Sequence, residues 1–223
     1  MEDDKGWLWL GTWNEAIHLL MPAESGDIRD AQFRQIPISK EKKIWNIWKI
    51  YQDNEQRYWL GTFGDGLFLM QLPAMASNKK NAQNWQPTFH NYLSVHGDNT
   101  SISSNIVKDI LQDSKGRLWI ATTLGLNHVV PNQLPATETF NTPTKAYPAM
   151  SFNQHIYNPN NNYSIAHNDI NSIYEDSQGL LWFGTFGGVC THSWFTNQFS
   201  VVEIFGFTHE TVSYTHLTLP TKA

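Results

Sequence analysis

The chain of 223 residues contains a single cysteine, Cys190, and charged residues make up only 16% of it. One cysteine cannot form an intrachain disulfide, and it excludes a zinc site built from several thiolates. No apolar run approaches the roughly 18 residues that a membrane-spanning helix requires. Residues 1–5 include acidic and basic side chains, and no apolar core of a signal peptide follows them. We therefore expect a soluble, globular segment that makes no membrane contact of its own.

Basic side chains are also scarce. Lys and Arg total 15 against 20 Asp and Glu, a net charge of −5, and no Lys/Arg-rich run occurs. A protein that binds a phosphate backbone needs a basic patch, so nucleic acid is excluded as a partner. The nine histidines stand singly, and repetition explains those at related positions: His18, His128 and His192. We therefore expect neither a metal site nor a cofactor.

A ten-residue pattern recurs four times without gaps, at residues 3–12, 53–62, 113–122 and 176–185. It reads Asp, two variable residues, usually Gly, two more residues, Trp, an apolar residue, a small residue and Thr. The Trp positions are 50, 60 and 63 residues apart. The residues that we expect to have structural roles in this repeat are Asp3, Trp9, Thr12, Asp53, Trp59, Thr62, Asp113, Gly116, Trp119, Thr122, Asp176, Gly179, Trp182 and Thr185.

The chemistry of the pattern predicts a tight hairpin followed by a buried strand. The Asp side chain can accept hydrogen bonds from the turn amides, and the Gly takes the left-handed position that closes the turn. Gln56 replaces this Gly in the second unit, so we expect a strained or differently shaped turn there. The Trp in the middle of each strand belongs to the core. The small residue two positions after it leaves room for a neighbouring sheet.

Each unit contains four short apolar runs separated by turn residues. One run precedes the Asp, one contains the Trp, one begins with Gly, and the fourth lies at 33–36, 89–93, 152–156 or 199–202. Four-stranded units that repeat at this spacing indicate an all-β fold, a β-propeller with one blade per unit. We expect blades at about 1–38, 44–93, 102–156 and 165–205. The inserts at 73–87 and 131–150 are expected to be surface loops.

About four blades are present, and the first has no opening strand before Asp3. We therefore interpret residues 1–207 as an incomplete arc of a larger propeller. Residues 208–223 break the repeat pattern. This tail resembles the translated sequencing-adapter sequence that contaminates some assembled genes, and the alternative is an ordinary disordered terminus.

The units resemble the two-component regulator propeller repeat, whose core is Asp-x-x-Gly-x-Leu-Trp-Ile-Gly-Thr followed by Gly-Gly-Leu. Residues 158–170 are similar to the linker between blades in that family, and residues 99–105 are the counterpart one blade earlier. The resemblance covers residues 1 to about 205. It departs from the family pattern at Gln56 and Ala121, each of which stands where the pattern has Gly.

The resemblance implies the periplasmic, extracytoplasmic sensor part of a bacterial signalling receptor. In such a receptor the remaining blades, a β-sandwich linker, a membrane helix and a cytoplasmic output would accompany this segment, and the receptor would be a homodimer. The output would be a histidine kinase or a diguanylate cyclase, so that this chain is itself not an enzyme. The ligand implied is a polysaccharide fragment or another small molecule.

The loops at the expected ligand-facing rim supply the candidate binding residues. Aromatic faces cover the apolar side of a sugar, while amides and carboxylates bind its hydroxyl groups. Residues of this kind follow each repeat Thr or precede each first strand, and they are Trp13, Asn14, Trp45, Asn46, Phe63, Asp65, Asn105, Thr123, Asn168, Asp169 and Phe186.

Two other classes of function remain as alternatives: a carbohydrate-active lyase or hydrolase, and a purely structural interaction surface. The Asp box of sialidase propellers has Asp and Gly two positions apart, whereas Asp113 and Gly116 are three apart. The repeated Asp residues are explained by turn structure, and no other carboxylate pair recurs. An enzyme would bring together an acid and a base with perturbed pKa values, and a scaffold would show neither these nor rim aromatics.

Overall fold

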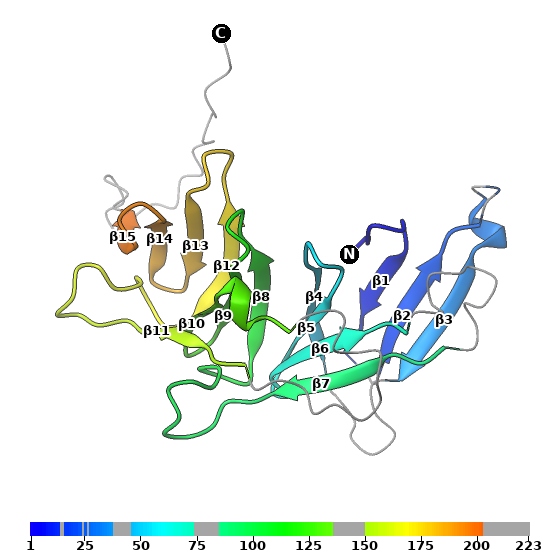
Figure 1. Ribbon diagram of the computed structural model, residues 1–223, viewed down its shortest axis with the longest axis horizontal. Helices are drawn as coiled ribbons and strands as arrows, with labels where there is room; N and C mark the ends of the chain where they lie inside the picture. The colour runs from blue at the N-terminus through cyan, green and yellow to red at the C-terminus, as the bar shows by residue number, and fades with distance from the viewer. Residues whose placement is uncertain are drawn as a thin grey trace, which may run out of the picture.

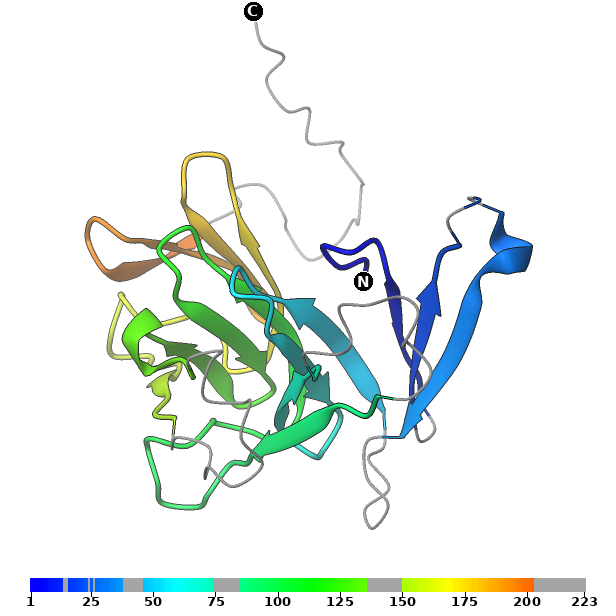
Figure 2. The same ribbon diagram turned by 45° about the vertical axis from the view of Figure 1, so that its right-hand side comes forward.

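The computed structural model describes residues 1–13, 16–23, 25, 27–37, 46–73, 85–135 and 150–202. The strands in these residues form four antiparallel sheets, each built from strands that are consecutive in sequence. Figures 1 and 2 show the sheets following one another in an arc, from β1–β3 to β12–β15. The all-β, propeller-type fold expected from the repeats is confirmed.

Three sheets have four strands, and the first has three. Blade 1 consists of β1 (Leu8–Gly11), β2 (Ala16–Met21) and β3 (Gln32–Pro37). Blade 2 consists of β4 (Ile47–Gln52), β5 (Tyr58–Thr62), β6 (Leu67–Gln71) and β7 (Thr88–Tyr92). Blade 3 consists of β8 (Val107–Gln112), β9 (Leu118–Thr122), β10 (Gly125–Val129) and β11 (Asn153–His155). Blade 4 consists of β12 (Ile170–Glu175), β13 (Leu181–Thr185), β14 (Gly188–Ser193) and β15 (Gln198–Val202).

In blade 1, residues 1–2 pair with β1 ahead of Asp3. Met1 and Trp9 exchange two hydrogen bonds, of 2.9 and 2.8 Å, and Glu2 forms an isolated antiparallel bridge with Leu8. A cavity of about 430 Å³ lies next to this pairing, between Met1 and Trp9 on one side and β4 on the other. Two residues before Asp3 are therefore paired with β1, which the repeat pattern did not predict.

The core is divided into three clusters, one between each pair of consecutive blades. Trp9, Trp59 and Trp119 are at most 1% exposed, and each packs into the cluster that its blade shares with the next one. Trp182 of blade 4 remains partly exposed. Repeats of this kind cannot bury both faces alone, so their stability depends on stacking.

One carboxylate organises each repeat turn. Oδ1 of Asp113 accepts hydrogen bonds from the backbone amides of Lys115 and Arg117, and Oδ2 accepts the indole N–H of Trp119 at 2.8 Å. The same bonds recur in the other three blades. This arrangement explains why Asp and Trp are always six residues apart. The pattern showed the spacing, but not the hydrogen bond between the two side chains.

The turn with Gln56 keeps the shape of the others and is strained. Gln56 has φ of 61°, close to the φ values of 72°, 80° and 78° at Gly6, Gly116 and Gly179. Its amide donates to the Asp53 carbonyl at 2.9 Å, as Gly116 donates to Asp113 at 2.8 Å. The sequence predicted either a strained turn or a differently shaped one, and the structure has the strained turn.

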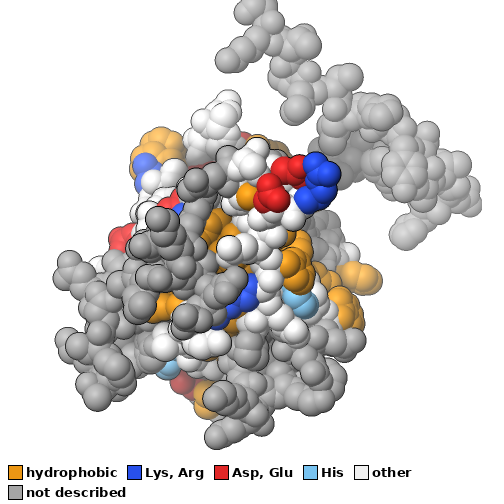
Figure 3. Space-filling view, turned by 90° about the vertical axis from the view of Figure 1, so that its right-hand side faces the viewer, with side chains coloured by type: hydrophobic (Ala, Val, Ile, Leu, Met, Phe, Trp, Pro, Cys, Tyr) orange, Lys and Arg blue, Asp and Glu red, His pale blue; other side chains and the backbone are white. Residues whose placement is uncertain are grey.

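Small residues allow the sheets to approach closely. A Cβ added at Gly11 would lie 2.8 Å from Cγ2 of Ile47, and one at Gly61 would lie 2.9 Å from Cγ1 of Val107. Both contacts join one blade to the next, as expected for the small residue two positions after Trp. Figure 3, which views the right-hand side of Figure 1, shows hydrophobic side chains exposed among polar ones.

Candidate ligand-binding site

Three exposed aromatic rings gather where blades 1 and 2 meet. The ring centroids of Trp13 and Phe63 are 6.2 Å apart, those of Trp48 and Phe63 are 5.5 Å apart, and those of Trp13 and Trp48 are 6.4 Å apart. Their side chains are 65%, 48% and 43% exposed for Trp13, Trp48 and Phe63. We call these three residues the aromatic cluster.

The repeat positions explain how the rings come together. Trp13 and Phe63 each follow the repeat Thr at the end of a Trp-containing strand. Trp48 lies in β4 at a register shift, since Ile47 pairs with Thr62 and Lys49 pairs with Gly61. Such a β-bulge leaves its extra residue unpaired and re-aims the side chain. The equivalent bulged residues of β8 and β12 are Lys108 and Asn171.

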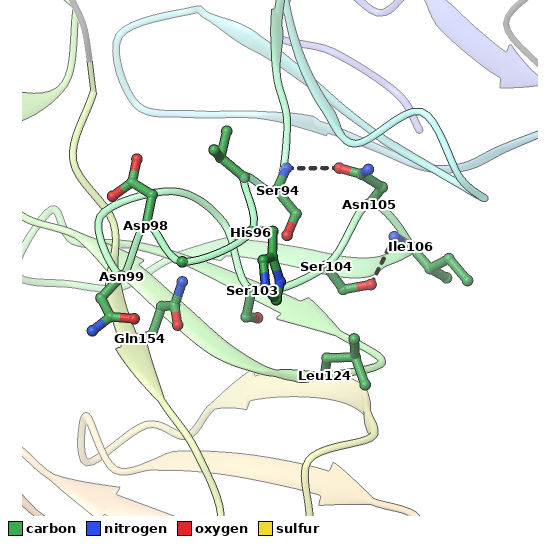
Figure 4. A pocket seen from close by; sticks show the side chains of 12 residues that line it. Ser94, His96, Asp98, Asn99, Ser103, Ser104, Asn105, Ile106, Leu124 and Gln154 are labelled. Carbon is green, nitrogen blue, oxygen red and sulfur yellow. Dashed lines mark hydrogen bonds between the residues drawn. The ribbon is translucent and has the colours of Figure 1, made fainter.

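A polar cavity of about 580 Å³ lies in the loop region between β7 and β8 (Figure 4). Hydroxyl, amide and imidazole groups dominate its lining, among them those of Ser94, His96, Asn99, Ser104, Asn105 and Gln154. Leu124 and Ile106 supply apolar surface at its wall. A concave site with many hydrogen-bonding groups and some apolar surface is suited to a small polar ligand.

The aromatic cluster and the cavity are adjacent. Phe63 of the cluster forms an isolated β-bridge with Ile106, which lines the cavity. The amides of Gly64 and Gly66 both donate to the carbonyl of Asn105, at 3.0 and 2.9 Å. These contacts connect the loop after β5 to the strand entry of blade 3 and hold the two parts of the site together.

The charged groups beside the bulged residues are paired. Nζ of Lys108 lies 2.6 Å from Oδ1 of Asp169 and donates to Oδ1 of Asn171 at 2.8 Å. Nζ of Lys49 lies 2.7 Å from Oδ1 of Asp109. The region around the bulged residues therefore has little unbalanced charge.

The carboxyl group in the lining of the cavity belongs to Asp98. It accepts hydrogen bonds from Oγ1 and the backbone amide of Thr100, at 2.6 and 2.8 Å, and these bonds lower its pKa. Asp98 is therefore ionised at neutral pH and is unsuited to donate a proton to a glycosidic oxygen.

Of the rim residues expected to bind ligand, Trp13 and Phe63 come together in the aromatic cluster. The side chains of Asn105 and Asn168 instead hold the linkers, because their Oδ1 atoms accept the backbone amides of Ser94 and Tyr157, each at 2.7 Å. Asn105 also lines the cavity.

The other expected rim residues are distributed over several blades. Oγ1 of Thr123 lies 2.9 Å from Oγ of Ser104, and Asp169 pairs with Lys108 as described above. The carbonyl of Asn46 accepts the amide of Phe63, while the amide of Asp65 donates to Oγ1 of Thr62. Phe186 is 78% exposed, and its ring lies 5.7 Å from that of His167. Asn14 and Trp45 lie outside the described residues.

Sequence reasoning missed Trp48 as a member of the site. The repeat gave a signal, since a large aromatic residue directly follows the inward-facing Ile47, where the other blades have Lys108 and Asn171. A strand alternation with period two does not predict which strand contains a bulge.

Two of the histidines, which stand singly in the sequence, form a partly buried pair in blade 3. Nδ1 of His128 lies 2.8 Å from Nε2 of His155, and the rings of Trp119 and Phe199 pack against them. Burial, together with the positive charges of Arg117 and His192, lowers the pKa of His128 to about 4. Burial, together with the charges of His128, His192 and Arg117, lowers the pKa of His155 to about 3. Among the described residues, no three His, Cys, Asp or Glu side chains gather as metal ligands.

Four consecutive antiparallel sheets, joined by repeated turns and by apolar interfaces between neighbours, define the described residues as blades of a β-propeller. Residues 101–123 and 164–187 match the family of two component regulator propellers. These two segments, in blades 3 and 4, thus match the family that the sequence resemblance indicated. No curated protein sequence matches the chain. None of the helices in the described part of the chain is long and apolar enough to cross a membrane.

Solved structures share this fold. An extracellular domain assigned to a hybrid two-component system of B. thetaiotaomicron matches with a TM-score of 0.59 and 22% identity, over 91% of this chain and 24% of that one. PorZ, a surface component of the type-IX secretion system of Porphyromonas gingivalis, matches with a TM-score of 0.57 and 14% identity, over 86% of this chain and 25% of that one. The chain thus spans about a quarter of the length of these two proteins.

An enzyme also shares the fold. Streptogramin B lyase matches with a TM-score of 0.52 and 11% identity, over 92% of this chain and 53% of that one. The identities are low for all three structures, so the likeness concerns the arrangement of blades. Function has to be argued from the site itself.

Proposed function

We propose that this chain is a ligand-binding sensor segment of a bacterial two-component-type receptor, located on the extracytoplasmic side. Its ligand would be an oligosaccharide derived from a polysaccharide, bound without chemical change. The propeller repeats of that family support the sensor class, and the aromatic cluster beside the polar cavity supports the ligand class.

The observation that carries the proposal is the exposure of Trp13, Trp48 and Phe63 next to a cavity lined by hydroxyl and amide groups. Exposed large aromatic side chains that cluster on a folded protein indicate a binding surface. Sugars have apolar faces of C–H groups that stack on aromatic rings, and their hydroxyls need hydrogen-bonding partners at the edge. The aromatic cluster provides the stacking surface, and the cavity provides the hydrogen-bonding groups.

The carboxylates of the site favour binding over glycoside hydrolysis. Hydrolysis requires one carboxyl group that is protonated near neutral pH, together with a second one about 5 to 9.5 Å away. Asp98 has a lowered pKa, and Asp109 and Asp169 form ion pairs with Lys49 and Lys108. A lyase remains the alternative from the enzyme class because a propeller lyase shares the fold.

Signalling would follow from a difference in affinity. A ligand shifts a receptor between two arrangements only as far as it binds one of them more tightly. In the proposed receptor, further blades and a β-sandwich linker would pass this difference to a dimeric output.

The test is thermal unfolding of the chain with a panel of neutral and acidic oligosaccharides. A ligand that binds the folded state raises the Tm, by several degrees when it is present far above its Kd. We expect a shift with one class of glycan, and we expect Trp48→Ala to remove it. The matched control is Phe195→Ala, because Phe195 is a 77% exposed aromatic residue at the turn between β14 and β15, outside the cluster.

Three results would count against the proposal. The first is the absence of a shift with every glycan class, and the second is a shift that Trp48→Ala leaves intact. The third is shortening of the glycan during incubation, read by chromatography, which would support the lyase or hydrolase alternative.

A further inference from the structure

The first strands of blades 2, 3 and 4 lie side by side, and one carboxylate joins all three. Oδ1 of Asp109 in β8 lies 2.7 Å from Nζ of Lys49 in β4, and Oδ2 accepts the backbone amide of Ile173 in β12 at 2.8 Å. Figure 1 shows the three strands in this order across the middle of the molecule. Equivalent positions of neighbouring strands are therefore close to one another.

Each of these strands contains the same irregularity near its start. The register shifts at one extra residue, which is Trp48 in β4, Lys108 in β8 and Asn171 in β12. We call these three residues the bulge row. A bulge leaves its extra residue unpaired and redirects the side chain. Because Trp48 belongs to the aromatic cluster, the repeat places Lys108 and Asn171 on the same rim of the next two blades.

The polar residues of the bulge row form a cluster with the residue that precedes β12. Nζ of Lys108 lies 2.6 Å from Oδ1 of Asp169 and donates to Oδ1 of Asn171 at 2.8 Å. The side chains of Lys108 and Asp169 are 14% and 28% exposed, so the ion pair is held in place between blades 3 and 4. We call Lys108, Asp169 and Asn171 the polar cluster.

The polar cluster lies within reach of the aromatic cluster. Phe63 of the aromatic cluster forms its isolated bridge with Ile106, two residues before Lys108. Two residues of extended chain span roughly 7 Å. A single short oligosaccharide can therefore contact both clusters.

The polar cluster retains hydrogen-bonding capacity that the described part of the chain does not use. An ammonium group has three N–H donors, and the two bonds of Lys108 occupy two of them. Oδ2 of Asp169 and Nδ2 of Asn171 form no hydrogen bond with any described residue. The cluster thus offers one acceptor and two donors, on groups that its own bonds hold in position.

Two neighbouring hydroxyl groups of a sugar match this set. A hydroxyl both donates and accepts, so one can donate to Oδ2 of Asp169 while the pair accepts from Lys108 and Asn171. Hydrogen bonds to ionised groups are also roughly twice as strong as those between neutral groups. A carboxylate on the ligand matches less well, because it would approach the negative charge of Asp169.

We propose that the bulge row is one continuous binding surface for a linear oligosaccharide of neutral sugars. One sugar residue stacks on Trp48, and a residue further along the same ligand binds the polar cluster through two neighbouring hydroxyls. This inference rests on the proposed function and adds to it the length and the charge of the ligand. A second contact on the same ligand costs no further loss of translational freedom, so affinity rises with chain length.

Isothermal titration calorimetry of the full chain with sugars of increasing length tests the inference. The probes are the mono-, di- and tetrasaccharides of glucose, mannose, xylose and arabinose, with tetragalacturonic acid as the acidic probe. We expect one neutral series in which the tetrasaccharide binds at least about tenfold more tightly than the monosaccharide. Lys108→Met should remove most of this difference by weakening the tetrasaccharide, whereas Trp48→Ala should weaken every member of the series.

Two further variants separate binding from folding and from charge. Lys115→Met is the matched control, because it removes the same charge from an exposed turn at the other end of β8 and should preserve the length dependence. Asn171→Ala shortens an exposed side chain of the polar cluster and should weaken the tetrasaccharide as Lys108→Met does. Near-UV circular dichroism establishes that each variant is folded.

The outcomes distinguish this inference from the proposed function. Binding that depends on Trp48 but has the same Kd at every length would overturn the inference alone. A length dependence that Lys108→Met and Asn171→Ala leave intact would do the same, as would binding of tetragalacturonic acid in preference to every neutral sugar. The absence of binding by all of these probes would count against the proposed function and the inference together.

Discussion

The indole Nε1–H of Trp119 donates a hydrogen bond of 2.8 Å to Oδ2 of Asp113, six residues earlier in the chain. The carboxylate is 1% exposed and also accepts two turn amides through Oδ1. One side chain therefore closes the hairpin and orients the tryptophan that packs against the next blade. This bond connects the local turn to the interface between blades, and three of the predictions below concern these two features.

Asp113→Ala should destabilise the chain by about 3 kcal/mol, because it leaves the Trp119 indole and the Arg117 guanidinium without their buried partner. The free energy of unfolding, measured in urea, checks this value. Asp176→Ala is the comparison, since Asp176 accepts the same turn amides and the indole of a partly exposed Trp, but has Leu180 in place of the Arg117 partner. Its loss should be smaller, and equal losses at the two sites would contradict the contribution of burial and of the Arg117 ion pair.

Gln56→Gly should stabilise the chain by about 0.5–1 kcal/mol, because glycine adopts the observed φ of 61° without steric strain. The reverse change in the next blade, Gly116→Gln, should destabilise it. There φ is 80° and an added Cβ would lie 3.2 Å from Cγ of Pro131. The urea midpoints of the two variants should move in opposite directions. A lower midpoint for Gln56→Gly would mean that its side chain makes a favourable contact that outweighs the strain.

Gly61→Ala should destabilise the chain by about 1–3 kcal/mol, because its Cβ would lie 2.9 Å from the carbonyl oxygen of Val107 in the next blade. A backbone atom cannot move aside without separating the sheets. At Gly184 the nearest atom is Oγ of Ser172, at 2.6 Å, which belongs to a side chain that can rotate. Gly184→Ala should therefore cost less, and thermal unfolding of both variants would detect the difference.

Stability should fall as the pH decreases from about 6.5 towards 4, in part because of His128 and His155. Their pKa values in the folded state, about 4 and about 3, lie below the value of about 6.5 expected in the unfolded chain. The unfolded chain then binds more protons over this range, so the stabilisation present above pH 6.5 is lost as the pH falls. Each histidine charged only in the unfolded chain changes stability by about 1.4 kcal/mol per pH unit.

The charged and titratable groups that face this pair are Arg117, Asp113 and His192. A variant of the pair itself tests its contribution to the pH dependence of stability. His128→Gln should reduce the slope of the free energy of unfolding against pH. Identical slopes for the wild type and His128→Gln would contradict the proposed role of the pair.

Much of the fold follows from the spacing of a few residue types. The positions of Asp53, Trp59 and Thr62, repeated in the other units, predicted the hairpins, the buried strands and the propeller class. The site was predicted only in part. Trp13 and Phe63 follow repeat positions and could be named, but Trp48 is directed into the cluster by a bulge in β4, which depends on pairing with β5.

Asn105 shows a second reason why the site was predicted only in part. An amide in a rim loop is compatible with ligand binding and with holding the loop, and its composition and spacing are the same in both cases. Its Oδ1 accepts the amide of Ser94, eleven residues earlier, and only the folded path of the linker brings these two groups together.

Local chemistry is thus encoded in the sequence. A carboxylate at the start of a turn, a residue with positive φ three positions later and an alternation of apolar residues specify each hairpin, because these interactions lie within ten residues. The pairing of Glu175 with Ser114, the cluster of Trp13, Trp48 and Phe63, and the contact between His128 and His155 depend on how whole sheets pack. Such contacts join residues far apart in the chain, so they exist only once the apolar faces of neighbouring blades are buried together.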